Sequence, residues 1–187
     1  MQIFNCEFSI FNLQGSHLRL AALAILAVAC GACDAAGPRT LAPVEVYFSP
    51  DGGATAAVIR EVDQARESIL VQAYSFTSRG IAQALVRARR RGVAVHVILD
   101  PSNLAERSSR AGYLASGGVR VLIDSAHEIA HNKVMVLDAA VVITGSFNFT
   151  HQAEVGNAEN LLILRDRQIA ARYAENWHAH ERHSKAY

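Results

Sequence analysis

Two catalytic patterns overlap in the stretch HEIAHNKVMVLD, residues 127–138, and both use His131. Read from His127, the pattern is H-E-x-x-H, in which two histidines one helical turn apart bind zinc and Glu128 acts as a base. Read from His131, it is H-x-K-x-x-x-x-D, whose histidine and lysine suit an attack on a phosphodiester. The elements that carry these residues decide between the two patterns.

The metalloprotease pattern needs a helix that carries both His127 and His131 on one face. Upstream, only two residues separate His127 from the strand-like run VRVLID, and downstream the run VMVLD is rich in branched apolar residues. The sequence leaves room for a loop here but not for a helix. A zinc protease built on these two histidines, with Glu154 or Glu159 as third ligand, is therefore a remote alternative.

The phosphodiester pattern agrees with a strand that begins near His131. Side chains two residues apart share one face of a strand, so His131 and Lys133 project together while Asp138 points to the opposite face. The same spacing in the following GSFN places Ser146 and Asn148 on one face. A histidine that attacks phosphorus, with neighbouring groups that stabilise charge on its oxygens, is the set that phosphoryl transfer needs.

The run HNKVMVLDAAVVITGSFNFT, residues 131–150, resembles the motif of the phospholipase D superfamily, H-x-K-x-x-x-x-D followed after six residues by G-S-x-N. The similarity extends from about Val44 to the C-terminus through VYFSPDGG, ILVQAYSFTS and NAENLLILRD, and it is strongest to small bacterial endonucleases of that superfamily. The resemblance implies an enzyme that cleaves phosphodiester bonds through a phosphohistidine intermediate. It also implies a phospholipase D-like fold with one copy of the motif per chain.

A role for each motif residue follows from the same resemblance. It implies His131 as the covalent nucleophile on phosphorus, Lys133 and Asn148 as phosphate ligands, and Ser146 as a supporting hydrogen-bonding residue. Glu159, in NAEN, would orient the histidine. Two further motif positions are expected to be structural, namely Asp138 and Gly145. Because the lysine and asparagine supply the charge stabilisation, we expect neither a metal nor a cofactor.

Strand-like and helical runs alternate through the first half of the folded part. Strands are predicted at residues 44–48, 68–76, 93–100 and 119–124, and helices at 54–65, near 81–91 and near 103–115. The second half has three strand-like runs with short connections and ends in an amphipathic helix at 168–180, so part of the sheet is predicted to be antiparallel. The sequence therefore predicts one α/β domain with a mixed, largely parallel sheet flanked by helices on both faces.

The N-terminal part reads as a leader. An apolar run, LAALAILAVA, follows Arg19 and falls short of the about 20 apolar residues that a membrane-spanning helix needs. Small residues before Cys30 suit a signal peptidase, so we expect residues 1–29 to be a signal peptide, 30–43 a linker and 44–187 the phosphodiesterase domain. The protein is expected in the periplasm or outside the cell, and AVAC also resembles a lipoprotein box that would anchor Cys30 to the membrane. The domain itself contains no cysteine, which excludes thiol chemistry.

One motif copy without an internal repeat has a consequence for assembly. The family mechanism uses two histidines, one to attack phosphorus and one to protonate the leaving oxygen. We therefore expect a two-fold homodimer with both His131 side chains in one shared active site. The formal net charge of +1 indicates no particular partner. The favoured substrate is DNA or RNA, cleaved without sequence specificity; the alternative is a phosphatidylcholine-type phospholipid, and a remote one is a non-catalytic nucleic-acid-binding module.

Several other residues have both a functional and a structural interpretation. The run RARRRG, residues 87–92, suits a nucleic-acid backbone but equally the C-terminus of a solvated helix. Tyr74 and Phe76 would either line a cleft at the end of their strand or pack in the core. Three C-terminal histidines lack a regular ligand spacing, so we expect them to be incidental and not a metal site. They are His178, His180 and His183.

Overall fold

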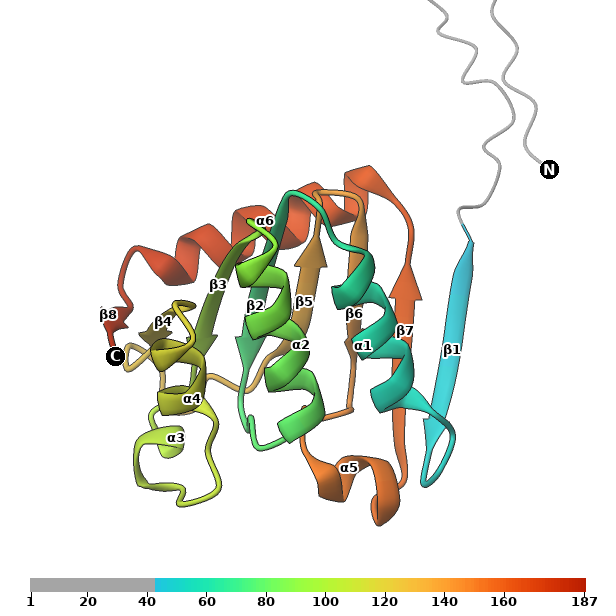
Figure 1. Ribbon diagram of the computed structural model, residues 1–187, viewed down its shortest axis with the longest axis horizontal. Coiled ribbons are helices and arrows are strands. Elements are labelled where there is room, and N and C mark those ends of the chain that lie inside the picture. The colour runs from blue at the N-terminus through green and yellow to red at the C-terminus, as the bar shows by residue number, and fades with distance from the viewer. Residues whose placement is uncertain (1–42) are drawn as a thin grey trace, which may run out of the picture. The chain divides into compact units, whose positions relative to one another are not determined.

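Eight strands form one mixed sheet in the computed structural model, which describes residues 43–187 (Figure 1). The strands are β1 (Val44–Ser49), β2 (Ser68–Ala73), β3 (Ala94–Leu99), β4 (Arg120–Ile123), β5 (Lys133–Leu137), β6 (Val141–Gly145), β7 (Glu159–Leu164) and β8 (Lys185–Ala186). Their spatial order is β1-β7-β6-β5-β2-β3-β4-β8. The expected signal peptide, the linker up to residue 42 and the expected lipid attachment at Cys30 lie outside the described residues.

The strand pairings are parallel only among β2, β3 and β4. Strand β2 pairs in parallel with β3, and β3 with β4, whereas the other five pairings in the described range are antiparallel. The prediction of a mixed α/β sheet between helices is confirmed, but the antiparallel share is larger than expected. A short turn joins β5 to β6, whereas α5 lies between β6 and β7. Parallel neighbours such as β2 and β3 need a longer crossover, which here contains α2.

Helices cover both faces of the sheet. They are α1 (Ala54–Gln64), α2 (Arg79–Arg90), α3 (Ser102–Ala105), α4 (Ala111–Ser116), α5 (His151–Val155) and α6 (Arg167–Glu181). Figure 1 shows α1, α2 and α4 in front of the sheet and α6 behind it. Helices α1 and α2 bury Val58, Val62, Ile81 and Leu85 in the main apolar core, as their helical spacing predicts. No helix of residues 43–187 is both long and apolar enough for a membrane crossing.

Helix α6 packs against the opposite face of the sheet through apolar side chains and one hydrogen bond. It buries Ala170 over the valines of β5 and β6, and it buries Trp177 completely. The indole Nε1 of Trp177 donates a hydrogen bond of 2.9 Å to the backbone carbonyl of Val71 in β2. The central strand of the sheet therefore fixes the position of the C-terminal helix.

The predicted helix near residues 103–115 is wrong in its middle, because the structure has two short helices, α3 and α4, with a loop between them. The buried side chain of Asn103 is the physical reason. Its Oδ1 accepts a hydrogen bond from the backbone N–H of Phe76, and its Nδ2 donates to the carbonyls of Tyr74 and Asp100. These bonds fasten α3 to the loop after β2, and the chain then needs several residues to reach α4.

Candidate active site

The residues predicted to do chemistry gather at one edge of the sheet, the lower one in Figure 1. Strand β6 ends there, and β5 and β7 begin there. The edge has an open cavity of about 490 Å³, and six of the seven predicted motif residues line it. These are His131, Lys133, Gly145, Ser146, Asn148 and Glu159.

Lys133 is a cation with little access to water. Its side chain is buried, and its Nζ donates a hydrogen bond of 2.9 Å to the backbone carbonyl of His131. Burial lowers the pKa of Lys133 below its usual value of 10.5, and the charge of Glu159 opposes this shift. The ammonium group therefore lies beside the exposed histidine, where it can stabilise an anion bound in the cavity.

Tyr74 lies against both His131, just before β5, and Lys133, the first residue of β5. Its ring centroid lies 4.6 Å from that of His131, and the Nζ of Lys133 lies 5.1 Å from the same ring. Its backbone N–H donates to the carbonyl of Asn132 at 2.8 Å. The sequence allowed Tyr74 either at a cleft or in the core, and the structure places it beside the site. Its position directly after a buried strand was the available signal, whereas Phe76 is buried in the core.

Ser146 and Glu159 form a short hydrogen-bonded unit. The Oγ of Ser146 donates to Glu159 Oε2 at 2.6 Å, and Asn157 Nδ2 donates to the other carboxylate oxygen at 2.9 Å. The backbone N–H of Asn160 donates to Ser146 Oγ at 3.0 Å. No hydrogen bond joins Glu159 to His131 in the described structure, so the expected orienting role of Glu159 remains a prediction.

Asn148 brings an unused acceptor to the cavity. Its buried Oδ1 has no hydrogen-bond partner among residues 43–187. Buried polar atoms without partners are rare, and functional sites are where they persist. The phenylalanines on either side of Asn148, Phe147 and Phe149, are buried in the core as expected and hold the loop in place.

Asp138 lies away from the cavity, just after the far end of β5. Its carboxylate accepts hydrogen bonds from the backbone N–H groups of Arg66, Glu67 and Ser68, at 2.9, 2.8 and 3.0 Å. Burial opposes ionisation of Asp138, but these bonds outweigh it and hold its pKa below the usual 3.8. The motif aspartate thus connects the start of β2 to the end of β5 and touches none of the residues that line the cavity.

The arginine run lies at the other end of the molecule. Arg87 pairs with Asp63 at 2.8 Å, and Arg91 donates to the backbone carbonyls of Val62 and Ala65. These residues stand at the C-terminal end of α2, which is the upper end in Figure 1. They bind α1 and do not line the candidate site.

Comparisons with known proteins show which family and which folds the chain resembles. Residues 58–180 match the family model described as cardiolipin synthase, PLD-like domain. The chain is 41% identical over 143 residues to a phospholipase D of Rickettsia prowazekii, which covers 76% of this chain and 70% of the relative. Nuc, a phospholipase D family member from Salmonella typhimurium, superposes with a TM-score of 0.74 and 38% identity over 78% of this chain and 97% of Nuc. NucT from Helicobacter pylori gives a TM-score of 0.73 and 25% identity over 78% of this chain and 99% of NucT.

Proposed function

The chain belongs to the phospholipase D superfamily and is one of its phosphodiesterases, and from this premise we propose that it cleaves DNA or RNA as a nonspecific endonuclease. The observation that carries the proposal is the match to Nuc, which the chain covers over 97% of its length at 38% identity. The cavity supports it as well, because an open edge admits a long polymer.

The proposed mechanism uses the groups that line the cavity. His131 attacks phosphorus, so a nitrogen–phosphorus bond forms as the bond to the leaving oxygen breaks. The buried ammonium of Lys133 and the amide of Asn148 donate hydrogen bonds to the non-bridging oxygens, which carry the negative charge. Water then hydrolyses the phosphohistidine and restores His131. These donors are sufficient for the charge stabilisation, so we expect the reaction to need no metal ion.

A second histidine must protonate the leaving oxygen and later activate the water. We assign this role to His131 of a second copy, because the chain carries the motif once. Two copies related by a two-fold axis would place both His131 side chains in one site, and each would be acid or nucleophile according to the direction in which the substrate binds.

A phospholipid is the second candidate substrate, and two observations favour it. The Rickettsia relative carries the name phospholipase D. Exposed apolar side chains also occur on segments at the catalytic end of the molecule, where they could enter a membrane surface: Leu104 is 60% exposed, Ile129 54% and Val155 42%. The active-site residues act on the phosphodiester and are the same for both substrates.

One experiment tests the reaction and separates the two substrates. The purified chain is incubated in magnesium-free buffer with EDTA, either with plasmid DNA and RNA or with phosphatidylcholine vesicles. His131→Asn is the inactive variant, and His151→Asn is the matched control because His151 is exposed and does not line the cavity. We expect nicked plasmid with the parent and with His151→Asn only. Choline release without nicking would select the phospholipid, and no turnover of either would leave a binding module.

Export is a further part of the proposal. The apolar run before Cys30 would direct the chain to the periplasm or the medium, either cut free or lipidated at Cys30. Mass spectrometry of the mature N-terminus tests this. A chain that starts at Met1 in the cytoplasmic fraction would contradict it, and an acylated Cys30 would select the anchored form.

A further inference from the structure

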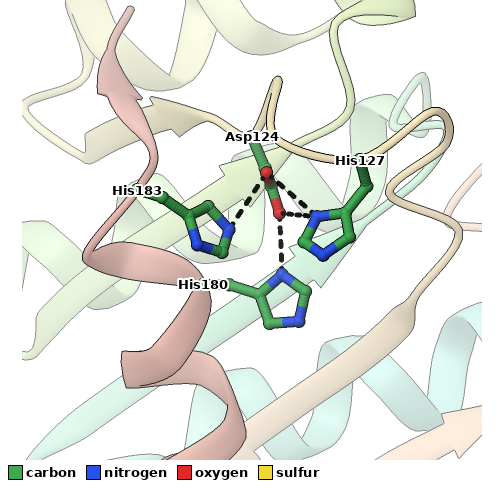
Figure 2. A group of neighbouring side chains, drawn as sticks. All are labelled: Asp124, His127, His180 and His183. Carbon is green, nitrogen blue, oxygen red and sulfur yellow. Dashed lines mark hydrogen bonds and ion pairs between the residues drawn. The ribbon is translucent and has the colours of Figure 1, made fainter.

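Three histidines and one aspartate converge on a single point away from the catalytic cavity (Figure 2). Asp124 directly follows β4, His127 lies in the loop toward β5, His180 is near the end of α6, and His183 follows that helix. One ligand atom from each of the four lies within 4.8 Å of those of the others. Local spacing in the sequence could not reveal this cluster, because its two halves are more than fifty residues apart.

Asp124 is the centre of the cluster. His180 Nδ1 lies 2.7 Å from Asp124 Oδ2, His127 Nδ1 lies 3.2 Å from the same oxygen, and His183 Nε2 lies 3.2 Å from Oδ1. Asp124 is fully buried, whereas the side chains of His127 and His183 are 46% and 36% exposed. The cluster therefore opens to solvent on the histidine side, from which an ion can enter.

Strand pairing and helix packing bring the two halves of this cluster together. Strand β8 pairs with β4, with Leu122 opposite Ala186 and Ile123 opposite Lys185. That pairing brings the chain after α6 back to Asp124, and Trp177 fixes the helix one turn before His180. His127 and His183 reach the same point from the segments next to these elements.

The separations and the ligand types fit a tetrahedral transition-metal ion. In a tetrahedral zinc site, with bonds of about 2.0–2.2 Å, neighbouring ligand atoms lie about 3.3–3.6 Å apart. The nitrogen–oxygen separations of 2.7 and 3.2 Å reach this range after a small outward rotation of the rings. Imidazole with a carboxylate suits zinc, whereas magnesium and calcium prefer oxygen ligands.

The three rings crowd around this one carboxylate, with ring centroids only 4.9, 5.2 and 5.3 Å apart. A divalent ion at the centre of the cluster would be bound by the ring nitrogens that face Asp124 and by the carboxylate itself.

We propose that Asp124, His127, His180 and His183 form a structural zinc site that joins the C-terminal segment to the loop before the catalytic strand. Four protein ligands complete the coordination, so the ion has no open position for substrate. The site takes His127 from the H-E-x-x-H pattern but neither Glu128 nor His131. Asp124 follows β4, and His180 and His183 come from the C-terminal segment. For His180 and His183 the proposal differs from the expectation that the C-terminal histidines are incidental.

Zinc binding to the full chain tests the proposal directly. The protein is purified without a polyhistidine tag, and Cys6, Cys30 and Cys33 are changed to serine in every sample because thiolates also bind zinc. After dialysis against zinc chloride and removal of free metal, zinc is counted by mass spectrometry. Competition with a coloured chelator gives the affinity, and cobalt substitution reports the geometry through its visible spectrum.

Two ligand variants and one matched control complete the design. His183→Ala and His127→Ala remove exposed ligands, so both are expected to fold. His178→Ala is the control, because His178 lies on the same helix but contacts Glu181. We expect one zinc per chain in the parent and in His178→Ala. Mutation of a residue that only supports a metal ligand typically lowers metal affinity by about 10–100-fold. Each ligand variant should lose more zinc affinity than that.

Thermal unfolding gives a second readout that does not depend on activity. Zinc should raise the Tm of the parent and of His178→Ala, and leave that of His183→Ala unchanged, because a ligand stabilises only the folded form that binds it. Equal zinc uptake by parent and ligand variants, or no uptake by the parent, would overturn the proposal. Calcium and magnesium should shift no Tm. An inactive enzyme that still binds one zinc would refute the proposed reaction and leave the metal site intact.

Discussion

At the scale of single residues, the burial of Lys133 has a consequence for the pH dependence of the reaction. The phosphate ligand must carry its proton, and burial lowers its pKa below the usual 10.5. The protonated form is lost as the pH rises through that lowered value, so kcat/KM should fall on the alkaline side before an ordinary lysine would titrate. Lys133→Arg should move this fall to higher pH, since a guanidinium stays charged, although with lower activity overall.

Full pH profiles of the parent and of Lys133→Arg give the measurement. Lys185→Arg serves as the control, because Lys185 is exposed in β8 and does not line the cavity. Identical alkaline limbs in the parent and Lys133→Arg would show that another group controls the fall.

Gly145 is required by packing. It has a φ of +148°, and a Cβ atom there would lie 2.3 Å from the backbone oxygen of Asn160. Gly145→Ala should therefore lower the free energy of unfolding by about 3 kcal/mol, from the clash together with the backbone strain. Gly92→Ala is the matched control, because its φ is +96° but no atom lies within 4 Å of the added Cβ. Denaturant unfolding should show a loss of only about 1 kcal/mol there.

At the scale of elements, the carboxylate of Asp138 connects the end of β5 to the start of β2 by accepting three backbone hydrogen bonds. The strength of these hydrogen bonds depends on the negative charge of Asp138. Because its folded-state pKa is lowered, its contribution to stability is present above pH 3.8 and is lost as the pH falls through the folded-state value. Asp138→Asn should cost about 1.5–3 kcal/mol at neutral pH. The difference between parent and variant should shrink in acid.

Urea unfolding at a series of pH values measures this change. Asp63→Asn is the control, since it removes an exposed ion pair with Arg87 that contributes less than about 1 kcal/mol. A deficit in Asp138→Asn that stays constant down to acid pH would contradict the assignment of stability to the charge.

The limits of sequence reasoning also lie at this scale. Apolar spacing predicted α1, α2 and α6 and the strands of the sheet, because a period of two or of 3.6 residues is a local property. The same spacing could not predict the interruption between α3 and α4, which the buried Asn103 causes through bonds to Tyr74 and Phe76. The two-residue strand β8 is likewise defined only by its partner β4.

At the scale of the whole molecule, the candidate active site could be predicted because most of its residues lie in two short runs of the sequence. The cluster of Asp124 and three histidines could not be predicted in this way. His131 and Lys133 lie two residues apart, and GSFN lies at the end of the next strand, β6, and directly after it. Asp124 and His183 meet only through the pairing of β8 with β4 and the packing of α6. Folding therefore created a group of side chains that no stretch of the sequence contains.

A shared active site predicts how mixed dimers behave. If both copies supply a histidine to one site, a dimer of one parent chain and one His131→Asn chain should be inactive. After unfolding and refolding of mixtures, activity should follow the second power of the parent fraction, and light scattering should show dimers at every ratio. A linear dependence would mean that each chain is active alone.

Strand order also determines when this chain can fold during its synthesis. The first strand, β1, has β7 as its partner, and β7 is among the last elements to leave the ribosome. The pairing of the central strand β2 with β5 likewise cannot form until β5 has been synthesised. Pairing between distant segments is slow because a long loop must close first. We therefore expect β1 to stay without its sheet partner until β7 has been made, so that the complete sheet forms only late in synthesis.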